Sequence, residues 1–252
     1  MKFFKFLAFA ALGVFMTSCN FTETMTLNED GSGKMSVFFD GSDLMAMGGE
    51  KLAESDSTSI DSIIDFKDFI EEKRDSINAL SPEDREKIMR LERFKMHIIM
   101  DPVSQKMTFD MFTDFDDVSD ANDILEGFDQ LDTFMGNGGE EEEEDDNAPE
   151  LPVSNDEKVS VKYSFKKGVF KRDAYVENAE KYKKQTDSLE SMAMFFGSSK
   201  YKLQYTFPRK IKATNREEAT FSADGKTVYY EVGFMDYLKD PNVLDIEVEL
   251  EN

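Results

Sequence analysis

Alternation of apolar and polar residues marks the first predicted strand, residues 20–27 (NFTETMTL). One side of this period-two pattern carries Phe21, Glu23, Met25 and Leu27, and the other side carries Asn20 and three threonines. Residues 28–33 (NEDGSG) are rich in turn formers and hold two glycines that can take positive φ. Residues 34–40 (KMSVFFD) resume the strand pattern, so the sequence predicts a β-hairpin over 20–40.

The same pattern predicts further strands. Residues 94–100 (FKMHIIM) and 105–112 (QKMTFDMF) each place apolar residues on one face and flank the turn Asp101-Pro102, which indicates a second hairpin. Later strands are expected at 158–165, 201–207, 219–222, 227–233 and 243–250, with a hairpin turn at Ala223-Asp224-Gly225-Lys226. Val169 and Phe170 either continue the strand before them or begin a short partner.

Apolar residues at helical spacing predict amphipathic helices between these strands. A long helix is expected from Ser59 to Leu80, after a loop over residues 41–58. Ser81 is expected to cap a second, shorter helix that has Pro82 at its first position. Two more helices are expected, one over Asp116–Met135 with Ser119 as its cap and one that Asp173 caps and that runs to about Phe196.

An acidic low-complexity segment, residues 137–157, separates two predicted halves of the chain. Glu140–Asp146 form an unbroken acidic run whose mutual repulsion opposes collapse. We interpret the segment as a disordered linker or long surface loop between a first half, residues 19–136, and a second half, residues 158–252. Both halves are expected to form one α+β domain, an antiparallel sheet of hairpins covered by amphipathic helices.

The first eighteen residues have the layout of a secretory signal peptide. A short basic head precedes the apolar run 6–16, which is too short to span a bilayer, and the run leads into Met16-Thr17-Ser18-Cys19. This tetrapeptide resembles the lipobox of bacterial lipoproteins, with Met16 where that family usually has leucine or another aliphatic residue. The resemblance implies cleavage after residue 18 and lipidation of Cys19. The alternative is an ordinary signal peptide, or a buried helix, with an incidental cysteine.

Cys19 is the single cysteine of the chain. An unpaired thiol in an exported protein calls for an explanation, and lipidation supplies one. Two or more acyl chains anchor a protein firmly, and no later segment has the ~20 consecutive apolar residues of a spanning helix. We therefore expect a mature protein that lies on the membrane, attached through Cys19. No acidic run directly follows Cys19, which favours the periplasmic face of the outer membrane.

The two ends of the chain resemble lipoprotein domains. The opening, Cys19 followed by a strand, the turn Asp30-Gly31-Ser32-Gly33 and a second strand, resembles LppM-type lipoprotein domains. The closing segment, Ala223-Asp224-Gly225-Lys226 before a strand and then Asp240-Pro241, is similar to small uncharacterised Bacteroidetes lipoproteins. The LppM resemblance implies contact with envelope lipid or a host surface, and it brings no catalytic residue with it.

The charge balance limits the partners. With 53 acidic and 30 basic residues, the chain has a formal net charge of −23. This argues against nucleic acid, since phosphate binding needs clustered Lys and Arg, and against broad electrostatic adhesion to anionic membranes. The negative charge leaves divalent cations and basic proteins as possible partners. The 23 Phe and 15 Met residues, without tryptophan, predict a core of aromatic and flexible side chains.

Few residues offer catalytic or metal-binding chemistry. His97, the single histidine, alternates with Met96 and Ile98 and is expected on a sheet face or at the surface. Residues 28–33 carry oxygen ligands without the spacing of an EF-hand loop, so we interpret them as a turn. The run 140–146 is interpreted as a solvated spacer in preference to a loose calcium site. We therefore expect no catalytic residue, no metal site and no cofactor.

Two functions are compatible with these features. The first is a non-enzymatic envelope lipoprotein that binds an envelope protein or an apolar ligand, or serves as a structural component. Its Met- and Phe-rich interior suits an adaptable apolar pocket, although ordinary core packing explains the same residues. The second is a hydrolase that uses paired carboxylates on envelope glycans or peptides. It predicts a cleft with two acids within reach of each other, one with a raised pKa.

Overall fold

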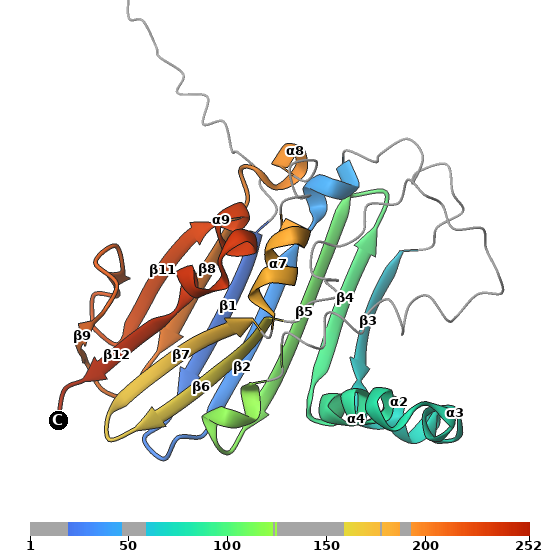
Figure 1. Ribbon diagram of the computed structural model, residues 1–252, viewed down its shortest axis with the longest axis horizontal. Coiled ribbons are helices and arrows are strands. Elements are labelled where there is room, and N and C mark those ends of the chain that lie inside the picture. Colours follow the sequence, from blue (N-terminus) through green and yellow to red (C-terminus); the bar gives the residue numbers. More distant parts are fainter. Residues whose placement is uncertain (1–19, 47–58, 123, 125–158, 177, 187–192) are drawn as a thin grey trace, which may run out of the picture.

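The computed structural model describes residues 20–46, 59–122, 124, 159–176, 178–186 and 193–252. Two β-sheets lie face to face, and short helices flank them (Figure 1). The expected α+β class is confirmed. Residues 1–19, which include Cys19, the acidic segment 137–157 and most of the helix expected at 116–135 lie outside the described residues.

The larger sheet holds eight strands, and all neighbouring pairs are antiparallel except β1 and β8, which are parallel. In spatial order its strands are β10 (Thr220–Phe221), β11 (Thr227–Gly233), β8 (Lys200–Thr206), β1 (Asn20–Leu27), β2 (Gly33–Asp40), β5 (Lys106–Phe115), β4 (Lys95–Asp101) and β3 (Ile60–Asp65). The hairpins expected at 20–40 and 94–112 are confirmed as β1–β2 and β4–β5. β1 joins the two sequence halves, because its other neighbour, β8, follows the acidic segment.

The smaller sheet is antiparallel and consists of β6 (Val159–Lys166), β7 (Val169–Val176), β12 (Ile246–Leu250) and β9 (Ile211–Thr214). Val169 and Phe170 begin the partner strand β7, because Lys167 and Gly168 both take positive φ, 54° and 75°, and reverse the chain. In Figure 1 this sheet lies over the β8–β1–β2 part of the larger sheet. A second sheet thus supplies much of the cover that was expected from helices.

The core between the two sheets is built mainly from aromatic and aliphatic side chains, as one cluster that spans both. Phe21 of β1 stacks between Phe39, with ring centroids 4.5 Å apart, and Phe234, at 4.3 Å. Offset stacking at such distances adds to the hydrophobic burial of the rings. A separate small cluster of Ile70, Ile77 and Ile88 holds three helices together.

The helices are short. They are α2 (Phe66–Glu72), α3 (Arg74–Ala79), α4 (Pro82–Arg90), α7 (Ala179–Thr186), α8 (Ala193–Phe196) and α9 (Phe234–Lys239), with 3-10 turns at Leu91–Arg93, Val118–Ala121 and Pro241–Leu244. Residues 42–46 are also helical, where a loop was expected. Among the described residues, no helix has the length and apolar character needed to span a membrane.

The prediction of one long helix from Ser59 to Leu80 is wrong in its first part. Residues 60–65 form β3, which pairs with β4 at the edge of the larger sheet. Helix α2 begins only at Phe66, where the side chain of Asp65 accepts a hydrogen bond from Lys67 N at 3.1 Å. The β-branched residues Ile60, Ile63 and Ile64 suit a strand, and the free edge of β4 supplies the partner that sequence spacing does not reveal.

Two expected helix caps are also wrong. Asp173 lies inside β7, and the helix after it begins at Ala179, where Asn178 Oδ1 accepts from Lys181 N at 3.1 Å. The alternation of buried and exposed residues through Asp173 favours the strand.

At the other position, Asp117 is the cap in place of Ser119. Asp117 Oδ1 accepts from Ser119 N at 2.9 Å, and Asp120 completes a capping box. The strand expected at 243–250 begins later, at Ile246, because Asp240 caps a 3-10 turn at Pro241–Leu244.

We expect Gly33→Ala to destabilise the fold by about 2 kcal/mol, the usual cost of overpacking. A methyl group at Gly33 would overlap the carbonyl oxygen of Thr26 and lie 2.6 Å from Phe115 Cζ. The matched control is Gly31→Asn, because Gly31 has φ +89° and open space around it, so this change costs about 1 kcal/mol or less. Urea unfolding measures both, and equal losses would contradict the packing argument.

Candidate functional site

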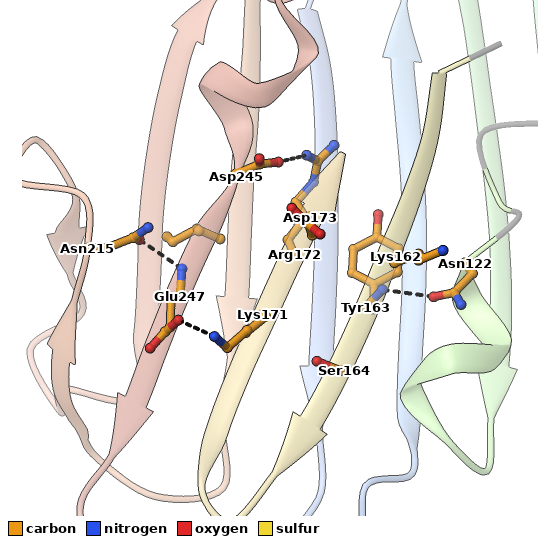
Figure 2. A pocket seen from close by; sticks show the side chains of 11 residues that line it. Asn122, Lys162, Tyr163, Ser164, Lys171, Arg172, Asp173, Asn215, Asp245 and Glu247 are labelled. Carbon is orange, nitrogen blue, oxygen red and sulfur yellow. Dashed lines mark hydrogen bonds and ion pairs between the residues drawn. The ribbon is translucent and has the colours of Figure 1, made fainter. Parts of the chain in front are cut away.

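A hollow of about 560 Å³ lies on the smaller sheet. Strands β6, β7 and β12 line it, and Figure 2 shows its side chains paired with one another. Lys171 Nζ lies 2.6 Å from Glu247 Oε2, and Asn215 Oδ1 accepts from Glu247 N at 2.8 Å. Asn122 Oδ1 accepts from Tyr163 N at 2.8 Å. The lining is polar and of mixed sign, and much of it is already engaged in hydrogen bonds and ion pairs within the protein.

Two further hollows, of about 610 and 420 Å³, are also lined by charged groups. The first includes Lys67, Arg93 and Asp114, and the second includes Glu29 and Arg209. Arg209 bridges its hollow, since Nε lies 3.1 Å from Glu29 Oε2 and Nη1 donates to the carbonyl oxygen of Glu251 at 2.7 Å. Mixed-charge linings of this kind are suited to polar contacts.

Beneath the smaller sheet, β1 carries a carboxylate into the core. Glu23 has 0% exposure and lies on the same face of β1 as Phe21 and Met25, which are also buried. A buried carboxylate is strongly destabilising unless it is paired and hydrogen-bonded. Four side chains supply that pairing, two from each sheet.

The larger sheet contributes two phenols from β8. In the parallel register Glu23 pairs with Leu203, so Tyr201 and Tyr205 lie on either side of the carboxylate and on the same face. Tyr201 Oη donates to Glu23 Oε2 at 3.0 Å, and Tyr205 Oη donates to Oε1. The parallel pairing of β1 and β8 therefore determines which hydroxyls reach Glu23.

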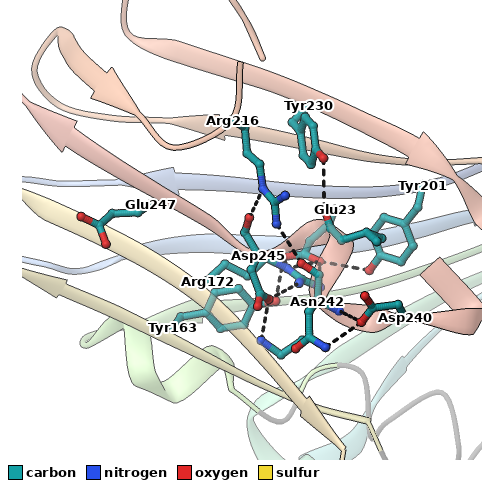
Figure 3. A network of polar contacts seen from close by, with 12 residues as sticks. Glu23, Tyr163, Arg172, Tyr201, Arg216, Tyr230, Asp240, Asn242, Asp245 and Glu247 are labelled. Atoms are coloured by element: carbon teal, nitrogen blue, oxygen red, sulfur yellow. Dashed lines mark hydrogen bonds and ion pairs between the residues drawn. The ribbon is translucent and has the colours of Figure 1, made fainter. Parts of the chain in front are cut away.

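The smaller sheet contributes a phenol and a guanidinium, from Tyr163 of β6 and Arg172 of β7, which are direct cross-strand partners. Tyr163 Oη donates to Glu23 Oε1 at 2.7 Å. Arg172 Nε lies 3.2 Å from Oε1, and its Nη2 donates to Oε2 at 3.3 Å. Figure 3 shows Tyr163 and Arg172 of the smaller sheet and Tyr201 of the larger sheet around Glu23. A charge-assisted pair thus connects the sheets through the core.

The electrostatics keep the four partners of Glu23 in one protonation state. Burial, followed by the charge of Glu23, raises the pKa of Tyr163, Tyr201 and Tyr205 well above the usual value. Burial opposes the charge of Arg172, but the attraction of Glu23 and of the three tyrosines together outweighs burial and raises the pKa of Arg172. The phenols therefore remain hydrogen-bond donors and the guanidinium remains charged. Such groups hold the structure together and do not exchange protons near neutral pH.

Arg172 extends the network toward Asp245. Its Nη1 is buried without a hydrogen-bond partner among the described groups and lies 3.9 Å from Asp245 Oδ1. Asp245 Oδ1 accepts from Ala174 N at 2.7 Å, and burial raises the pKa of Asp245. The backbone oxygen of Asp245 accepts from Arg216 Nε, and Arg216 Nη2 donates to the carbonyl of Asn242 at 2.8 Å. These contacts attach the turn before β12 to the network.

The residues considered for chemistry from the sequence lie apart from Glu23. His97 is on β4, and its Nε2 lies 2.7 Å from Asp61 Oδ1 of β3. Asp30 accepts from Ser32 Oγ at 2.7 Å and from Ser32 N at 3.1 Å, which lowers the pKa of Asp30 and closes a turn. No group of three or more His, Cys, Asp or Glu side chains is placed to hold a metal ion within the part of the chain that the structure describes.

The Glu23 network was not predicted from the sequence. One signal was present, a charged residue inside the apolar set of the first strand. The partners of Glu23 lie 140 to 182 residues away in the sequence, so a local pattern does not identify them.

Comparison with known proteins gives little further information. No protein-family model matches the chain, and no curated protein matches it. A solved structure, the NMR structure of the folded domain of Mycobacterium tuberculosis LppM, matches with a TM-score of 0.35 and 8% identity, over 92% of this chain and 89% of that one. This is a structural neighbour of the expected LppM type, and it lends no support to the Bacteroidetes resemblance. A likeness at this level says nothing about function.

Removing either charge of the buried pair is expected to be severely destabilising. Glu23→Ala and Arg172→Met should each lower the free energy of unfolding by about 3–5 kcal/mol, because each leaves a buried charge unpaired. The double variant should lose less than the sum of the two, by about 2 kcal/mol. Lys34→Ala is the matched control, because its ion pair with Asp114 is exposed, and it should change stability by less than about 1 kcal/mol. Additive losses in urea unfolding would contradict the coupling.

We expect stability to fall as pH rises above about 10, the ordinary tyrosine pKa. The unfolded chain releases the protons of Tyr163, Tyr201 and Tyr205 there, whereas the folded protein keeps them because the pKa of each is raised. Each tyrosine then contributes a slope of up to about 1.4 kcal/mol per pH unit, and this contribution is absent well below pH 10. Urea unfolding across this range measures the slope. Tyr205→Phe should reduce the slope by the contribution of one proton, about 1.4 kcal/mol per pH unit. An unchanged slope would contradict the raised pKa of Tyr205.

Proposed function

We propose that this chain is a lipid-anchored envelope protein with a non-enzymatic binding or structural role. Residues 1–18 act as a signal peptide, and Cys19 carries the lipid that holds the mature protein at the periplasmic face of the outer membrane. The observation that carries the proposal is the position of β1, which begins at Asn20, one residue after Cys19. The folded body therefore starts directly at the anchor.

The state of Glu23 supports a non-enzymatic role. Among the residues that the structure describes, Glu23 is the acidic residue that is fully buried. Three phenols and Arg172 already occupy its carboxylate oxygens. A hydrolytic carboxyl group must instead reach a substrate and exchange a proton with it. Glu23 lacks this access, and the protonation states of its partners are fixed over the physiological range.

Asp245 is the observation that bears on the hydrolase alternative, because it lines the hollow on the smaller sheet and burial raises its pKa. Its Oδ1 is engaged, however, by the backbone N–H of Ala174 and faces Arg172. A second acid of the same hollow, Glu247, is paired with Lys171. These contacts favour a structural role for both carboxylates over a catalytic pair.

Between the two kinds of partner, the packing favours an envelope protein over an apolar ligand. Stacked rings fill the described core around Phe21. The hollows of about 560 and 420 Å³ are lined largely by charged and polar side chains. Polar linings of this kind suit the polar rim of a protein–protein interface. With its negative net charge, the chain is not expected to bind nucleic acid.

Cys19→Ser is expected to release the protein from the membrane fraction, because the hydroxyl cannot carry the thioether-linked lipid. In cells that are fed radiolabelled palmitate, the wild-type protein should take up label and the variant should not. Ser18→Ala is the matched control, since it keeps a small residue before the cysteine and should leave anchoring intact. Absence of label from the wild-type protein, while a known lipoprotein in the same cells is labelled, would overturn the proposal.

A further inference from the structure

The end of the larger sheet at which β1 begins also carries a protruding turn. Asn20 pairs with Asp40 of β2, and Asp40 pairs with Thr108 of β5. β5 starts two residues before Thr108, at Lys106, and residues 102–105 join it to β4. Figure 1 shows this β4–β5 turn at the same end of the molecule as the start of β1.

The turn holds an apolar side chain in solvent. Val103 is 93% exposed, the highest value among the exposed large hydrophobic residues of the described chain. Its backbone is fixed, because Asp101 Oδ1 accepts from Val103 N at 3.1 Å and Asp101 Oδ2 accepts from Ser104 Oγ at 2.6 Å. Ser59 Oγ also donates to Asp101, at 3.0 Å, and ties the turn to the residue before β3. Val103 therefore projects from a well-defined tip.

Strand geometry gives the reach of this tip. β1 and β4 are three strand steps apart, about 14 Å across the sheet. The last strand pair before the turn, Asp101 and Lys106, lies two residues beyond the level of Asn20. A rise of two to four residues of strand corresponds to about 7–13 Å, which is the height of the turn above that level. The Cα atom of Cys19 is only about 3.8 Å from that of Asn20. For strands that run along the bilayer normal, a sulfur held at the bilayer surface places the tip within the depth of the headgroup region, about 5–10 Å.

We infer that the β4–β5 turn inserts Val103 into the interface of the bilayer that holds Cys19, so that the domain has two points of contact and a fixed orientation. The inference rests on the proposed lipid anchor. At the base of the turn, the carboxylate of Asp101 is occupied by the three hydrogen bonds above, and Lys106 is its register partner on the neighbouring strand. The exposed apolar side chain of Val103, followed by the uncharged residues Ser104 and Gln105, is suited to the interface between headgroups and acyl chains.

The test uses the full chain, produced and processed in bacterial cells and placed in vesicles of phosphatidylethanolamine and phosphatidylglycerol. Val103→Cys carries a thiol-reactive fluorophore, and the lipids carry a quencher at a shallow acyl position. Met89→Cys is the matched control, because Met89 is an apolar, 43% exposed residue of α4, and α4 lies at the opposite end of the larger sheet (Figure 1). Quenching at position 103 should be at least about twice that at position 89.

The outcomes separate the inference from the proposed anchor. Wild-type protein should not react with the fluorophore, since its single cysteine is lipidated, and labelling of the wild type would overturn the anchor itself. If the wild type is unreactive and bound to vesicles, but positions 103 and 89 are quenched equally, the anchor stands and the inserted turn is overturned. Both substitutions fall at exposed positions, so the fold should tolerate them.

Discussion

The structure depends on one buried charge, the carboxylate of Glu23. A carboxylate inside a β-sandwich is unfavourable unless its oxygens are fully occupied, and here three phenols and Arg172 occupy them from both sheets. The occupied state exists in one arrangement of the strands. A shift of β8 by one residue would turn Tyr201 and Tyr205 away from the core. The network therefore acts less as a source of net stability than as a constraint on register.

That constraint explains how distant parts of the chain form one body. β1 comes from the start of the described chain, whereas Tyr163, Arg172, Tyr201 and Tyr205 all follow the acidic segment. Hydrophobic burial would pull these strands together without specifying which pairs with which, because apolar contacts are non-directional. The hydrogen bonds to Glu23 are directional, and they select the parallel pairing of β1 with β8 and the placement of β6 and β7 above it.

Local pattern predicted most strands, since alternation and turn residues act within a few positions of each other. It failed where a partner decided the outcome. Residues 60–65 fit helical spacing, yet the free edge of β4 made them a strand. Asp173 suited a cap, yet its cross-strand pairing with Lys162 placed it inside β7. Local pattern also could not predict the Glu23 network, because the partners of Glu23 are distant in the sequence. A glutamate among the apolar residues of the first strand was nevertheless a visible signal.

Because β1 lies inside the larger sheet, with a strand on either side, its position determines how the sheet would resist a pull on the proposed anchor. β1 is paired with β2 from Asn20 to Leu27 and with β8 from Asn20 to Thr26. An anchor joined to an edge strand could peel that strand away, since one ladder of hydrogen bonds would yield residue by residue. A pull at Cys19 can detach β1 only by breaking its hydrogen bonds to both β2 and β8. It must then also separate the Glu23 carboxylate from Arg172. A lipid at this position would hold the whole sheet, and the proposed second contact at the β4–β5 turn would then be enough to orient the domain.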